Sequence, residues 1–169
     1  MTEEGKSNYG AIPLELLKYM NHPGSNNCIK VPDGNGGEKV IRYDLFVSLL
    51  FKQESFKDMV NHARGGCCEE AGELSSVIKR HITYGMALDA PMKEDGKTVL
   101  THIIEELGDL RFFMQAIQNL FGISESAILQ HNSNKLSTRY AGLAYSDVAA
   151  VTRLDKDNGP VSPDEGLPE

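Results

Sequence analysis

Paired carboxylates occur twice along the chain, each time at a spacing that suits metal chemistry. The segment EEAGEL holds Glu70 and Glu73, and the segment EELGDL holds Glu106 and Asp109. Residues three apart on a helix are neighbours, with Cβ atoms about 5–6 Å apart, and a pair of like charges left alone costs roughly 0.2–0.5 kcal/mol. Carboxylate oxygens without cysteine or histidine are the ligands that Mg²⁺ and Mn²⁺ prefer. Both pairs are therefore candidate metal ligands.

The two pairs can meet if their helices pack against each other. Apolar residues at helical spacing predict helices over about 67–84 and 98–121, and each carboxylate pair borders the apolar stripe of its helix. Measured from the connecting loop, Glu73 lies about 18 Å and Glu106 about 12 Å along its helix, a difference of about one turn. Antiparallel packing would then gather all four carboxylates, and such a partly buried group of anions requires cations. The sequence therefore predicts a metal site between these helices.

Two other interpretations of the carboxylates stay open. A single pair at this spacing is typical of a solvated helix face, so the hypothesis depends on two pairs that are in register beside apolar stripes. A di-iron site is a rival, but it usually has Glu-x-x-His on two helices, whereas Glu73 and Asp109 stand at those positions here. His102, one turn before Glu106, is interpreted as a packing residue.

The elements that must position these residues are mostly helical. Helical periodicity, serine caps and glycine stops predict helices over 43–53, 55–64, 67–84, about 98–121 and 124–140, with Ser55 and Ser124 as caps and Gly85 and Gly122 as stops. The pair Gly65-Gly66 either interrupts the helical pattern or permits a close helix crossing. The predicted fold class is all-α, a bundle of about four helices with a small β-hairpin appendage.

The N-terminal part and the tail differ in pattern from the helical part. Runs rich in β-forming residues at 28–31 and 39–44 flank a glycine-rich loop and predict a hairpin, and a short helix is predicted over 12–20. The tail carries proline, glycine and acidic residues with hardly any apolar ones, a composition typical of disorder. The predicted organisation is an N-terminal extension (1–42), a helical domain (43–154) and a disordered tail (155–169).

Composition and charge limit the classes of protein to which this chain can belong. The chain has 169 residues, 40% of them apolar and 24% charged, which fits one globular domain. A net charge of −7 argues against a nucleic-acid partner, which needs a basic stripe. Without an apolar run of about 18 residues, no membrane helix is expected. The three cysteines, two of them adjacent, form no disulfide framework and fit a reducing cytoplasm, and the N-terminal residues lack the pattern of a signal peptide.

The carboxylate segments also carry a family resemblance. EEAGEL followed by EELGDL resembles the ExxE…ExxD signature of the MazG-like, all-α nucleoside triphosphate pyrophosphohydrolases, which are related to the dimeric dUTPases. NSNKLSTRY at 132–140 is similar to the N-x-x-K-L-x-x-R-Y helix of that family, and 145–157 resembles the short segment that follows it. The likeness covers about 55–157 and leaves 1–50 unmatched.

The resemblance implies hydrolysis of a nucleoside triphosphate to the monophosphate and pyrophosphate with about two or three Mg²⁺ or Mn²⁺ ions. The implied catalytic residues and metal ligands are Glu70, Glu73, Glu106 and Asp109, with Glu69 and Glu105 as further candidates for taking the proton of the attacking water. The candidate phosphate- and nucleotide-binding residues are Asn132, Lys135 and Arg139, with Lys79 as a further one.

The resemblance also bears on assembly and substrate. Members of the family usually build their bundle from two or four chains, and the apolar faces that the helices leave uncovered fit a homodimer or homotetramer. The long N-terminal extension and acidic tail are similar to phage-encoded members of the MazZ type, which act on dGTP and dATP and would work in the host cytoplasm. The alternatives are a phosphoribosyl-ATP pyrophosphohydrolase, a di-iron oxidase, and a non-catalytic helical interaction module.

Overall fold

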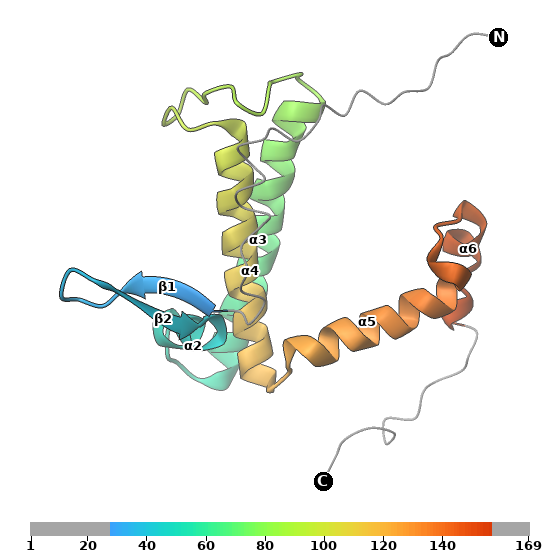
Figure 1. The fold of residues 1–169 in the computed structure, drawn as a ribbon, viewed down its shortest axis with the longest axis horizontal. Coiled ribbons are helices and arrows are strands. Elements are labelled where there is room, and N and C mark those ends of the chain that lie inside the picture. Colours follow the sequence, from blue (N-terminus) through green and yellow to red (C-terminus); the bar gives the residue numbers. More distant parts are fainter. Residues whose placement is uncertain (1–27, 157–169) are drawn as a thin grey trace. The chain divides into compact units, whose positions relative to one another are not determined.

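The computed structural model describes residues 28–156 (Figure 1). The chain divides into two compact units between Lys52 and Gln53. The helix predicted over 12–20 lies outside the described residues. Of the predicted tail, the structure describes only Asp155 and Lys156. Each unit is described by itself below.

The first unit holds the β-hairpin and one short helix. Strand β1 (Cys28–Pro32) pairs antiparallel with β2 (Glu38–Arg42). In the connecting loop, the Asp33 carboxylate accepts hydrogen bonds from the backbone N–H groups of Asn35 and Gly37, which lower its pKa. Helix α2 (Tyr43–Leu50) follows β2 directly and contacts it. The predicted hairpin is confirmed.

The second unit is built around a helical hairpin. Helices α3 (Phe56–Ile82) and α4 (Val99–Phe121) run side by side (Figure 1). Ser55 caps α3 by accepting a hydrogen bond from the Asp58 N–H, and Thr98 caps α4 in the same way. Gly122 ends α4 in the left-handed conformation, with φ 66°, where glycine carries no steric penalty. The predicted antiparallel helix pair is confirmed, and so are the Ser55 cap and the Gly122 stop.

A close helix crossing occurs at Gly66. Helix α3 continues without a break through Gly65 and Gly66, so of the two interpretations of this pair the interruption is wrong. A Cβ atom built on Gly66 would lie 2.5 Å from ring atoms of Phe113 on α4, whereas one on Gly65 would meet nothing within 4 Å. The missing side chain of Gly66 therefore lets the Phe113 ring lie directly against α3.

Apolar contacts hold the hairpin at both ends. Next to the connecting loop, Val77, Met92 and Val99 are buried in one cluster. At the other end, the Phe56 and Phe121 rings meet edge to face, with centroids 5.7 Å apart. The middle of the hairpin, where the carboxylates lie, is thus fixed from both sides.

The chain beyond α4 forms a small helical array. It consists of α5 (Glu125–Arg139), η2 (Ala141–Leu143), α6 (Asp147–Thr152) and η3 (Leu154–Lys156). Helix α5 contacts η2 and η3, and within the described part of the chain no residue of α5 is buried. The all-α character is confirmed, while the predicted oligomeric bundle stays a prediction. Among residues 28–156, no helix is long and apolar enough to cross a membrane.

Candidate metal centre

Three carboxylates from α3 and α4 meet in the middle of the helical hairpin. One oxygen from each of Glu70, Glu106 and Asp109 lies within 4.8 Å of the others. Glu70 and Glu106 are half-buried, and Asp109 is exposed. Glu70 comes one turn after Gly66 on α3, and Asp109 comes one turn before Phe113, the residue of α4 that contacts Gly66. The close crossing therefore sets the separation of the two helices at the carboxylates.

The pKa values of Glu70 and Glu106 are raised by burial and by the neighbouring carboxylates. Burial raises the pKa of Glu70, and the charge of Asp109 and then that of Glu73 raise it further. Burial also raises the pKa of Glu106, again with Glu73 and Asp109 adding to the shift. Each carboxylate is thus held in an electrostatically unfavourable group. A cation bound among them would remove that penalty, and the all-oxygen donor set suits a hard divalent ion.

The fourth predicted ligand, Glu73, is not part of the group whose oxygens lie within 4.8 Å of one another. Its charge acts on the pKa of both Glu70 and Glu106. Glu69 is exposed on α3, and its charge also contributes to the raised pKa of Glu70. The structure therefore brings the predicted acidic residues of α3 and α4 into one neighbourhood.

The predicted phosphate-binding residues of α5 are placed differently from one another. Asn132 and Lys135 are exposed. Arg139 donates two hydrogen bonds to Asp155, with N–O distances of 2.6 and 2.8 Å, and the Asp155 side chain is only 4% exposed. In this structure Arg139 therefore serves to fasten η3 to α5. The fourth candidate, Lys79, places its Nζ 5.8 Å from the centroid of the Tyr84 ring.

Acid should loosen the attachment of η3 to α5. The Arg139 hydrogen bonds lower the pKa of Asp155 from 3.8 to about 2. Because the folded-state pKa is depressed, this contribution to stability is complete above pH 3.8 and is lost as the pH falls toward about 2. Asp155→Asn should lower the melting temperature at pH 7, and the difference from wild type should shrink between pH 4 and pH 2. A difference that is constant over this pH range, measured by circular dichroism, would contradict the attachment.

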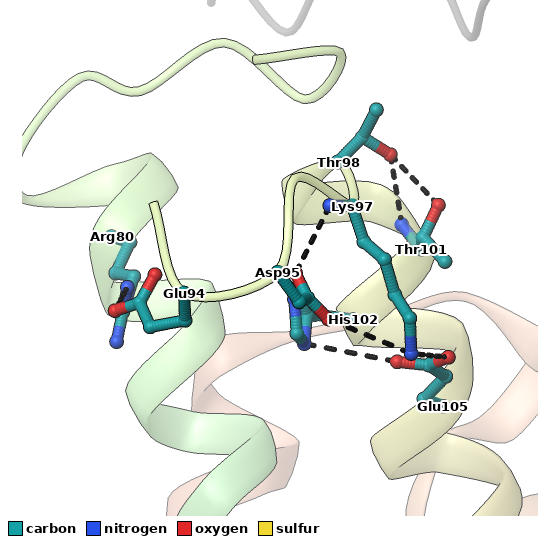
Figure 2. A network of polar contacts seen from close by, with 8 residues as sticks. All are labelled: Arg80, Glu94, Asp95, Lys97, Thr98, Thr101, His102 and Glu105. Atoms are coloured by element: carbon teal, nitrogen blue, oxygen red, sulfur yellow. Dashed lines mark hydrogen bonds and ion pairs between the residues drawn. The ribbon is translucent and has the colours of Figure 1, made fainter. Parts of the chain in front are cut away.

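A loop lysine and a histidine that contact acidic residues near the start of α4 are not among the site residues that the sequence predicts. The Lys97 Nζ lies 2.6 Å from Glu105 Oε1, and the His102 Nε2 lies 3.1 Å from Asp95 Oδ1 (Figure 2). The sequence predicts His102 as a packing residue, and its side chain is only 16% exposed. The sequence gives no reason to select Lys97, because this residue lies in the loop before α4. The helical spacing that groups Glu105 with the other acidic residues does not extend to it.

Comparison with known proteins adds no relative. No protein-family model matches the chain, and neither a curated protein nor a solved structure matches it. The class that the fold and the site define is a helical protein with a carboxylate cluster suited to a divalent cation.

Proposed function

We propose that this protein is a metal-dependent hydrolase that converts a nucleoside or deoxynucleoside triphosphate to the monophosphate and pyrophosphate. The observation that carries the proposal is the meeting of Glu70, Glu106 and Asp109 oxygens within 4.8 Å. The raised pKa values of Glu70 and Glu106 support it, because burial and the neighbouring carboxylates disfavour the charged form of both side chains. The sequence likeness to the MazG-like enzymes supplies the reaction.

The site residues fit Mg²⁺ or Mn²⁺. Glu70, Glu106 and Asp109 would hold the ions, and Glu73, whose charge acts on Glu70, is the further candidate ligand. A bound divalent ion would supply charge neutralisation for the triphosphate and would lower the pKa of a water molecule. In the proposed hydrolysis, the oxygen of the attacking water forms a bond to the α-phosphorus. The bond from the α-phosphorus to the bridging oxygen breaks, and its electron pair leaves with pyrophosphate.

The proton of the attacking water needs an acceptor. Glu69 is exposed beside Glu70 and is the more accessible of the two candidates named from the sequence. Glu105 already accepts a hydrogen bond from Lys97. We therefore assign Glu69, or the solvent, as the acceptor of this proton.

Assembly with further copies of the chain is part of the proposal. Large apolar side chains are more than a third exposed on α3, α4 and α5, among them Ile78, Ile82, Ile104, Leu107, Met114, Ile128 and Leu129. Extensive exposed apolar surface marks interaction sites, and helical hairpins cover such surface by packing into bundles. A homodimer or homotetramer would complete a four-helix-type bundle. Sedimentation velocity measures the mass, and a monomer at micromolar concentration would contradict the assembly.

The proposed reaction has a direct test. Purified protein should release pyrophosphate and monophosphate from at least one member of a panel of ribo- and deoxynucleoside triphosphates with Mg²⁺ or Mn²⁺. Purine deoxynucleotides are the favoured substrates, following the likeness to the MazZ type. Ion-exchange chromatography separates the products. Release of orthophosphate and a diphosphate, or no turnover with any nucleotide of the panel, would overturn the proposal.

A further inference from the structure

The face of α4 that carries Glu106 and Asp109 continues toward the loop between α3 and α4. His102 lies one turn before Glu106, and Glu105 lies one turn before Asp109, so both share this face of α4. The His102 Nδ1 lies 3.8 Å from Oε2 of Glu105, the residue next to Glu106. The loop end of the site therefore has its own set of charged groups.

The loop fixes the backbone of Lys97 beside this face. Its N–H donates to Asp95 Oδ1 at 3.0 Å, and its carbonyl oxygen accepts from the Met92 N–H at 2.7 Å. The Asp95 Oδ1 is also 3.1 Å from His102 Nε2, so one carboxylate joins the loop to α4 (Figure 2). Gly96 takes the positive φ of 76° that this turn requires. The position of Lys97 is thus set before any ligand arrives.

The side chain of Lys97 is held far less firmly than its backbone. Its Nζ lies 2.6 Å from Glu105 Oε1 and 3.6 Å from Asp95 Oδ2. The Lys97 side chain is 47% exposed and that of Glu105 is 40% exposed. Exposed ion pairs contribute little to stability, and water or another anion can replace either partner. The hydrogen bond to Glu105 raises the pKa of Lys97, so the amine is a cation at neutral pH.

We propose that Lys97 binds the terminal phosphates of the triphosphate, and hence the pyrophosphate product, with Glu105 holding its ammonium group until a phosphate takes its place. The inference rests on the proposed function. An ammonium group is a point charge that binds phosphate oxygens through charge-assisted hydrogen bonds. Lys97 keeps its proton throughout and takes no part in bond breaking. Asp95 and His102 are positioning residues, because they hold the turn that carries Lys97.

The test measures binding of pyrophosphate in the presence of Mn²⁺ by isothermal titration calorimetry. Lys97→Met should weaken pyrophosphate binding about tenfold, the loss of one charge-assisted hydrogen bond, and should raise KM more than it lowers kcat. Lys97→Arg should retain most of the affinity. Glu105→Gln should bind pyrophosphate at least as tightly as wild type, because the competing carboxylate is gone. Lys93→Met, which removes another lysine of the same loop, should match wild type.

The outcomes separate this inference from the proposed function. If wild type hydrolyses nucleotides and Lys97→Met binds pyrophosphate as tightly as wild type, the inference is overturned and the proposed function stands. If Lys93→Met weakens pyrophosphate binding as much as Lys97→Met, the inference is also overturned, because the total positive charge of the loop would then explain the effect. Loss of Mn²⁺ binding or of the melting transition in Lys97→Met would show that Lys97 is structural. Wild-type protein that binds neither Mn²⁺ nor pyrophosphate would overturn both.

Discussion

Replacing Asp109 by asparagine should lower kcat for triphosphate hydrolysis about 100-fold or more, because it removes the charge of one of three clustered ligands. The amide keeps the size of the side chain, so the helical hairpin should stay folded. The measurement is the initial rate of pyrophosphate release at saturating Mg²⁺ or Mn²⁺. Asp89→Asn, the same chemical change in the exposed loop, is the control and should retain wild-type activity.

The same substitution should have the opposite effect on the stability of the metal-free protein. Asp109 raises the pKa of both Glu70 and Glu106, so removing its charge relieves repulsion in the folded state. The melting temperature in EDTA should rise at pH 7. The rise should disappear in acid, because carboxyls with raised pKa values are protonated there and no longer repel one another. Near-normal activity together with an unchanged melting temperature would show that the metal site lies elsewhere.

Substituting alanine for Gly66 should destabilise the fold by about 1–3 kcal/mol, the usual cost of forcing atoms into a packed contact. The added Cβ would lie 2.5 Å from the Phe113 ring, which is too close, and the partly buried ring also packs edge to face against His62 and Phe112. Gly65→Ala is the matched control. With nothing within 4 Å of its Cβ, it should stabilise the helix by roughly 0.5–1 kcal/mol. Urea unfolding of both variants measures the difference.

The Gly66 variant also links packing to the metal site. Because the crossing lies one turn from Glu70 and one turn from Asp109, pushing the helices apart should weaken Mn²⁺ binding as well as stability. Adding Phe113→Leu should recover part of both losses, since a smaller side chain makes room for the new methyl group. If Gly66→Ala is as stable as Gly65→Ala, the two helices are not in close contact at this point.

The helical hairpin and the meeting of its carboxylates follow from short-range patterns in the sequence. The i, i+3 spacing determines which acidic residues share a helix face. The number of residues to the connecting loop determines their position along the helix axis. Glu70, Glu106 and Asp109 meet, whereas Glu73, which the same arithmetic places with them, is not part of this group. The same arithmetic could not choose between a break and a crossing at Gly66. That choice depends on Phe113, a residue on the opposite helix that no local pattern connects to it.

Contacts between distant residues account for what the sequence could not show. Arg139 matched a phosphate-binding pattern, but the fold places Asp155 against it, from a segment whose composition predicted disorder. Lys97 reaches Glu105 across the turn that precedes α4. In both cases the contact depends on how the chain folds back on itself. Residue type and local spacing alone do not predict it.

The connection between α3 and α4 has a consequence for the order of folding. The two helices are neighbours along the chain and are joined by one loop with its own apolar cluster. Only this loop must close to bring them together. Contacts of low sequence separation carry a small loop-closure entropy and form early in folding. All the clustered carboxylates come from this one pair of helices. The centre can therefore assemble while the rest of the chain is still unfolded, and a divalent cation present at that stage would act as a template for the hairpin.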